Sequence, residues 1–234
     1  MIQFRFGLTP VKDIQPWGGD TPSLSWFSLT DGWYVIEADG HHLFRDSDAT
    51  HVDYYVVRLW EDVLDALPEA LEPVPEDLLP FVAGDHRGWR PNVSPKTGAA
   101  ANWYGQHGLD TGYLRSAPHI RWWRTVEKES GDDLMTVTWT DAQDEEHVRV
   151  AVPTSAFIDA VTAFDRDLFA AMEDRVTTLE TTRPPSGVAI DLPRLRHEQR
   201  DRAKWLSRAP DRTCDTDWVA VRAGARALAP VPPP

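Results

Sequence analysis

Residues 1–45 alternate between apolar and polar side chains in the way that β-strands do. Residues 2–6 predict a first short strand. Residues 23–45, SLSWFSLTDGWYVIEADGHHLFR, hold Asp-Gly pairs at 31–32 and 39–40 between aromatic and β-branched residues. Because Asp-Gly suits the two-residue turn of a hairpin, this stretch predicts two successive hairpins. Aromatic residues fall on both faces of these strands, so we expect a scaffold sheet that is covered on both sides.

A second alternating region predicts a three-stranded antiparallel meander, with strands at 119–126, 134–140 and 148–152. In its middle strand, Met135, Val137 and Trp139 share one face and threonines share the other. This division predicts one buried and one more polar face.

Helical periodicity appears before and after the meander. Leu59, Val63 and Leu67 stand four residues apart, which predicts a helix over 58–67 that ends at Pro68. A stripe of apolar residues at spacings of three and four predicts the longest helix over 155–179.

Two shorter helices are predicted to close the chain, over 191–208 with Asp191 as N-cap and over 216–228. The fold class that follows is α+β: an antiparallel sheet of N-terminal hairpins plus a three-stranded meander, packed by C-terminal helices. We expect a single domain over 1–230 and a disordered tail over 231–234.

The charge of the chain is strongly negative, with 24 Lys and Arg against 37 Asp and Glu and a net charge of −13. Residues 61–80 hold seven acidic residues and no basic one, among them Glu61, Asp62 and Asp65. Such a surface repels nucleic-acid phosphates and acidic membranes and attracts basic molecules. We therefore expect a basic protein partner, and neither a nucleic acid nor a membrane.

Cysteine usage and leader signals indicate the compartment. Cys214 is the only cysteine, so no disulfide can form within the chain, as is usual in a reducing compartment. The N-terminus lacks the apolar core of a signal peptide, and no run of 18 apolar residues occurs. We expect a cytoplasmic protein.

Residues 83–118 form the longest segment without regular periodicity, and six glycines and three prolines interrupt it. Long ordered loops commonly carry binding sites. This loop and the following strand are rich in Trp, Tyr and Arg, which are enriched at binding hot spots. The predicted binding residues are Trp89, Arg90, Trp103, Tyr104, Tyr113, Arg115 and Trp123, together with Glu61, Asp62 and Asp65.

Motifs for catalysis are absent from the sequence: it holds no GxSxG, no P-loop and no GxGxxG. His86, His107, Asp110 and His119 surround the long loop and could bind a metal or transfer protons if they converge, which their spacing does not decide. His41, His42, His51 and Asp53 are more typical of a hairpin surface. We assign no catalytic residue, no metal ligand and no cofactor.

Several stretches together resemble a family of actinobacterial proteins grouped as a domain of unknown function. They are FRFGLTP, WFSLTDGWYVIEADG, YYVVRLWEDVLDALPEALEPVPEDL, TGYLRSAPHIRWWR, FDRDLFAAMEDRV and TDWVAVRAGARAL. The resemblance spans nearly the whole chain and implies no activity, cofactor or catalytic residue. More loosely, LTDGWYVIEADG is similar to the sheet-opening motif of some SMI1-type immunity proteins.

Three functions follow as hypotheses. The first is a non-enzymatic acidic binding protein of immunity or antitoxin type that covers a basic toxin. The second is a metal-dependent hydrolase that uses the His-rich loop 86–119. The third is a module whose Trp-lined groove stacks a sugar or a base. The sequence leaves the oligomeric state open.

Overall fold

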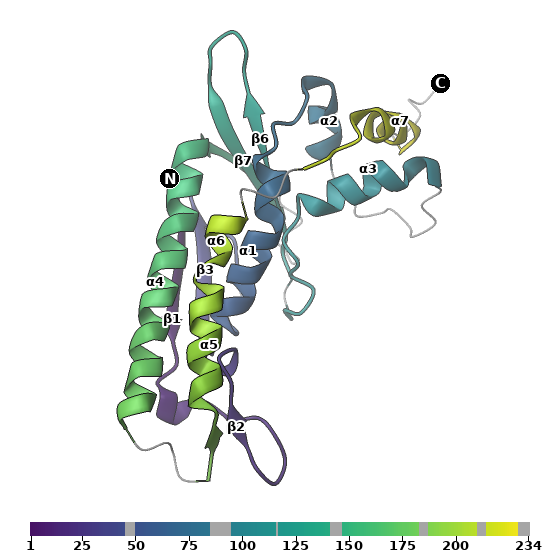
Figure 1. The fold of residues 1–234 in the computed structure, drawn as a ribbon. Coiled ribbons are helices and arrows are strands. Elements are labelled where there is room, and N and C mark those ends of the chain that lie inside the picture. The colour runs from purple at the N-terminus through teal and green to yellow at the C-terminus, as the bar shows by residue number, and fades with distance from the viewer. Residues whose placement is uncertain are drawn as a thin grey trace. The chain divides into compact units, whose positions relative to one another are not determined.

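The structure is a computed structural model that describes residues 1–44, 50–84, 95–115, 117–140, 147–182, 187–209 and 214–228. Its contacts gather into two compact units (Figure 1). Unit 1 joins Met1–Asp65 to Ser155–Asp211, and unit 2 joins Ala66–Thr154 to Arg212–Pro234. One domain can contain two such units, so the single domain over 1–230 stays a prediction.

The main sheet of unit 1 is antiparallel and is centred on β3 (Gly32–Ala38). β1 (Ile2–Leu8) pairs with β3 along its whole length and forms one edge of the sheet. The short strands β4 (His41–His42) and β5 (Val52–Asp53) also pair with β3. A separate parallel pair joins β2 (Ser23–Leu24) to β9 (Ala189–Ile190).

Only one of the two predicted hairpin turns is present. Asp39 and Gly40, with φ of 49° and 82°, turn the chain from β3 into β4, as predicted. The predicted turn at 31–32 is wrong, because Asp31 ends the short 3-10 helix η2 (Ser28–Thr30) and Gly32 begins β3. A Cβ on Gly32 would lie 2.1 Å from the carbonyl oxygen of Gly7, so glycine here permits the close approach of β1 instead.

Helix α4 (Thr154–Thr181) covers one face of this sheet, where the ring of Phe164 stacks on Phe4 at 5.3 Å. The opposite face carries Arg5, whose side chain is 57% exposed, and its partner Glu37 at 2.7 Å. The expectation of a sheet covered on both faces holds only in part, because Val35 on this second face is buried while Arg5 is exposed.

The remaining helices of unit 1 pack around buried polar contacts. Helix α5 (Leu192–Arg202) has Asp191 as its N-cap, as predicted, but the expected helix over 191–208 divides into α5 and α6 (Trp205–Arg208). The buried amide of Gln199 accepts a hydrogen bond from Trp26 Nε1 at 2.9 Å and donates to the carbonyl of Phe169 at 3.1 Å.

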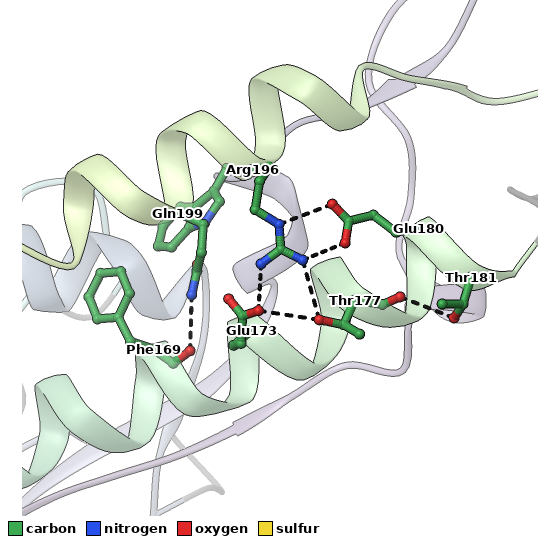
Figure 2. A network of polar contacts seen from close by, with 8 residues as sticks. Phe169, Glu173, Thr177, Glu180, Thr181, Arg196 and Gln199 are labelled. Atoms are coloured by element: carbon green, nitrogen blue, oxygen red, sulfur yellow. Dashed lines mark hydrogen bonds and ion pairs between the residues drawn. The ribbon is translucent and has the colours of Figure 1, made fainter.

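A polar network ties α5 to α4 on the surface of unit 1 (Figure 2). The guanidinium of Arg196 bonds Glu173 and Glu180, each at 2.5 Å. Between these two glutamates on α4, Arg175 donates to the backbone carbonyls of Leu29, at 2.5 Å, and Thr9. The two contacts of Arg175 join segments that lie more than a hundred residues apart in the sequence.

Helix α1 (Val56–Leu71) begins in unit 1 and ends in unit 2. It is longer than predicted and contains Pro68 rather than ending there. Because proline lacks an N–H, a helix that contains it lacks one backbone hydrogen bond.

Unit 2 contains the predicted meander as a sheet of its own, in the order β6 (His119–Val126), β7 (Asp133–Thr140) and β8 (His147–Pro153). Its helical part consists of η3 (Glu76–Leu78), α2 (Leu79–Val82), α3 (Pro95–Gln106) and α7 (Trp218–Leu228). One core cluster joins these helices to β6 and includes Phe81, Val82, Trp103, Trp123 and Val221.

The α+β fold class is confirmed, since both units combine helices with antiparallel strands. In the described part of the chain, no helix has the length and apolar character needed to cross a membrane.

Candidate functional site

The tryptophans predicted to line a binding surface are largely core residues. Trp103 and Trp123 are buried in the core cluster of unit 2, where Trp103 lies against Phe81 and Trp218. Trp89 and Arg90 lie outside the described residues. The described tryptophans of this set therefore stabilise unit 2 and offer no exposed ring face to a ligand.

The tyrosine and arginine residues of the predicted set are placed differently. Tyr104 is half-buried and donates a hydrogen bond to the carbonyl of Gly84 at 2.9 Å. Arg121 lies 4.2 Å from the Tyr104 ring centre and donates to the same carbonyl. Tyr113 is half-buried and Arg115 is exposed.

The predicted acidic residues of α1 are engaged within unit 1. Glu61 forms an ion pair with Arg202 at 2.5 Å, and the buried Asp62 lies 3.3 Å from Arg58. Asp65 is exposed.

The later acids of the same stretch have partners within unit 2. Glu72 accepts a hydrogen bond from Thr216 at 2.6 Å, and Asp77 pairs with Arg222 at 2.7 Å. Of the acidic stretch, Glu61, Asp62 and Asp77 thus lie against arginines, and Glu72 is held by a neutral hydroxyl.

The histidines around the long loop have unlike environments. His107 is buried, and its Nδ1 donates to the carbonyl of Trp103 at 2.7 Å. Asp110 accepts a hydrogen bond from the Gly112 N–H, whereas His119 is exposed on β6. His86 lies outside the described residues.

Of the residues with described positions, no three His, Cys, Asp or Glu are grouped so that they could hold a metal ion. On the outer face of the unit 1 sheet, His42 lies 3.1 Å from Glu37, and His51 lies 3.8 Å from Asp53. These are isolated pairs, and a metal site needs three or four convergent ligands.

A different set of side chains forms an exposed aromatic surface on unit 1, which we call the aromatic patch: Trp17, Phe27, Tyr54 and Tyr55. The Phe27 and Tyr55 ring centres are 4.7 Å apart, and Trp17 meets Tyr55 edge to face at 5.4 Å. Trp17 is 50% exposed and the other three rings are half-buried. Side chains of this kind provide much apolar contact area with polar tips.

The loop that carries Trp17 is closed by its own backbone. Trp17 and Ser23 exchange two backbone hydrogen bonds, at 2.9 and 2.7 Å. Gly18 has a φ of 120°, a conformation that favours glycine. The indole N–H of Trp17 donates to the hydroxyl of Tyr55 at 3.0 Å, so the exposed ring is held in place.

The other members of the aromatic patch come from two segments next to η2 and α1. Phe27 precedes η2, and its carbonyl accepts the hydroxyl of Thr30 at 2.7 Å. Tyr54 and Tyr55 lie between β5 and α1, and the N–H of Tyr54 bonds the carbonyl of Gly32 at 2.9 Å. Three segments thus converge on one surface.

The electrostatic surroundings of the aromatic patch are acidic. Burial raises the pKa of the Tyr55 hydroxyl, the hydrogen bond from Trp17 opposes this rise, and the charge of Asp31 adds to it. Residues 1–65 contain eleven Asp and Glu against four Lys and Arg. Asp31 is the acidic residue whose charge acts on the Tyr55 hydroxyl, and a cation near the rings would be attracted to it.

Sequence reasoning misses the aromatic patch because its residues are far apart in the chain and because Tyr54 and Tyr55 lie in VDYYVV, a stretch whose β-branched and aromatic residues are typical of a strand. A usable signal does exist at PWGG, residues 16–19. A tryptophan between proline and glycines lies in a loop, and loops run over the surface.

Comparison with known proteins gives a family and no individual relative. No curated protein and no solved structure matches the chain, and the likeness to SMI1-type immunity proteins gains no support. A family of unknown function, DUF5984, matches residues 3–224. The match covers nearly the whole chain, so the protein belongs to the DUF5984 family.

Proposed function

We propose that the protein is a non-enzymatic binding protein whose aromatic patch holds a basic protein partner. The observation that carries this proposal is Trp17, which is 50% exposed and yet fixed by its hydrogen bond to Tyr55. A large aromatic ring exposed in a fixed position is typical of an interaction hot spot.

The basic character of the partner follows from the rings and the charges around them. The face of an aromatic ring attracts Lys and Arg through its electron density. The chain uses the same interaction internally, where the guanidinium of Arg202 lies 4.8 Å from the ring centres of both Trp26 and Trp205. The net charge of −13 would also attract a basic partner over longer distances.

Within this class, we favour a cytoplasmic protein of immunity or antitoxin type that covers a basic surface of a toxin. Its support is the acidic charge, the aromatic patch and the lack of catalytic motifs in the sequence. The metal-dependent hydrolase and the Trp-lined groove have less support. The described histidines form no group that could hold a metal ion, which weakens the hydrolase hypothesis. Trp103 and Trp123 are buried, which weakens the hypothesis of a Trp-lined groove.

Binding to the products of neighbouring genes at low and high salt tests the proposal. We expect a basic partner whose affinity falls with salt, and we expect Trp17→Ala to weaken binding at least tenfold. Ile158→Ala, at another exposed apolar residue of unit 1, is the control and should bind like the unaltered protein. Thermal unfolding verifies that both variants are folded.

Two results would overturn the proposal. One is the absence of any partner among these gene products at low salt. The other is a folded Trp17→Ala variant that binds the partner as tightly as the unaltered protein.

A further inference from the structure

The aromatic patch lies beside a carboxylate, that of Asp31. Asp31 ends the 3-10 helix η2, which begins directly after Phe27. The carbonyl of the next residue, Gly32, accepts the N–H of Tyr54 at 2.9 Å, so Asp31 is next to the segment that carries Tyr55. Burial raises the pKa of the Tyr55 hydroxyl and the charge of Asp31 raises it further, which shows that the carboxylate acts on this ring.

Both the carboxylate and the rings lack a cation within the described part of the chain. Asp31 forms no ion pair with any described residue. Its charge acts on Arg175, but that guanidinium donates to two backbone carbonyls instead. None of the described Lys and Arg side chains lies over the ring of Trp17, Phe27 or Tyr55. The negative charge and the ring faces are thus both available to a partner.

Unit 1 combines the same two kinds of group at another place, and there an arginine lies between them. The guanidinium of Arg202 is 4.8 Å from the ring centres of Trp26 and Trp205. The same guanidinium forms an ion pair with Glu61 at 2.5 Å. The ring faces attract the positive charge, and the carboxylate accepts the N–H groups. In this protein, aromatic rings and one carboxylate therefore hold a guanidinium together.

We propose that the aromatic patch and Asp31 form a binding site for one arginine side chain of the protein partner. The inference rests on the proposed function, because it names the group by which the partner is held. The guanidinium stacks on the exposed Trp17 ring, and Asp31 supplies the opposite charge. The hydrogen bond from Trp17 to Tyr55 fixes the ring before the arginine arrives, so binding orders little of the site.

Arginine suits such a site better than lysine does. A guanidinium is planar and weakly hydrated, so it can stack on a ring while its edge donates hydrogen bonds to a carboxylate. An ammonium group is compact and strongly hydrated, and it has no flat face to stack. The site should therefore distinguish these two side chains although both carry one positive charge.

A titration of the full chain with blocked amino acids tests the site without any partner. N-acetylarginine amide is added at constant ionic strength, and the indole ¹H–¹⁵N resonance of Trp17, identified by its loss in Trp17→Phe, reports binding. We expect a saturable shift with a dissociation constant of roughly 1–10 mM, because a single side chain offers few atoms. N-acetyllysine amide should bind several-fold more weakly. N-acetylcitrulline amide, which resembles arginine but is neutral, should give no saturable shift.

Two variants that lose the same charge separate the effect of Asp31 from that of the net charge. Asp31→Asn should weaken the binding of N-acetylarginine amide roughly two- to fivefold, as is usual for an accessible ion pair. Asp159→Asn, at an exposed residue of α4, is the matched control and should bind like the unaltered protein. Circular dichroism verifies that both variants are folded.

Three results would overturn this inference. They are a Trp17 resonance that does not move, one that moves equally with the arginine and citrulline compounds, and a folded Asp31→Asn variant that binds as tightly as the unaltered protein. None of them depends on the gene products that test the proposed function. A protein partner that binds through Trp17 to a chain without this arginine response would keep the proposed function and remove only the arginine site.

Discussion

At the scale of single residues, the two units differ in whether their buried polar groups have hydrogen-bond partners. In unit 1, Trp26 and Trp60 donate their indole N–H groups to Gln199 and Asp165. In unit 2, within the described residues, the buried His107 Nε2 has no hydrogen-bond partner. Burial lowers the pKa of His107 to about 4, against the opposing effect of its hydrogen bond to Trp103.

This lowered pKa predicts a dependence of stability on pH. The unfolded chain protonates His107 near pH 6.5, while the folded chain keeps it neutral down to about pH 4. The unfolded state therefore binds more protons in this window. The contribution is complete above pH 6.5 and declines by about 3 kcal/mol as the pH falls to 4.

The measurement is urea unfolding of the protein and of His107→Gln between pH 7 and pH 4. The variant should lose this part of the pH dependence, whereas His119→Gln, at an exposed histidine, should keep it. NMR titration of the His107 ring gives the pKa without a variant, and a value near 6.5 would contradict the prediction.

At the scale of elements, α7 shows how one helix can have two unlike faces. Val221 and Ala225 lie in the core cluster of unit 2, and Val221 is 3% exposed. Val219, two residues earlier on the same helix, is 79% exposed. Asp217 caps the helix by accepting the N–H groups of Val219 and Ala220.

The two valines form a matched pair for substitution. Val221→Asp places a carboxylate without a partner in the core, and we expect a loss of several kcal/mol, enough to unfold unit 2. Val219→Asp places the same group in water and should change stability by roughly 0.5 kcal/mol or less. Near-ultraviolet circular dichroism and urea unfolding would measure both, and equal effects would refute the assignment of the faces.

At the scale of the whole molecule, each unit is built from two separated parts of the chain. The sheet strands β1 and β3 lie in Met1–Asp65, and the helix that covers them lies in Ser155–Asp211. Isolated hairpins are at best marginally stable in water without a packed face. The folding of Met1–Asp65 therefore depends on the packing of Ser155–Asp211 against its strands.

A fragment experiment tests this dependence. Residues 1–65 alone should lack stable structure by circular dichroism and NMR, and addition of residues 155–211 should restore it. A folded 1–65 fragment would contradict the prediction. Residues 66–154, which also lack their second segment, are the matching control and should not restore structure to 1–65.

Local signals predict much of this fold, and their failures have physical causes. Asp39-Gly40 is a turn because the strands on both sides pair with each other. Asp31-Gly32 has the same letters, but β3 pairs with β1, far earlier in the chain. Pro68 lies inside a helix for a similar reason, since contacts beyond its neighbours outweigh a local breaker.

The candidate site was less predictable than the fold. Trp103 and Trp17 are the same residue type, but one occupies the core of unit 2 and the other is half exposed. Composition alone does not distinguish them. The aromatic patch gathers residues from three segments, and only the folded chain brings them together.

Arg175 has a consequence for how the aromatic patch binds. Its one guanidinium bonds the carbonyls of Thr9 and Leu29, which flank the segment that carries Trp17 and Phe27. The conformational entropy of that segment is thus removed when unit 1 folds, before any partner arrives. Association then orders little of the chain, so more of the contact energy appears as affinity and as a slow rate of dissociation.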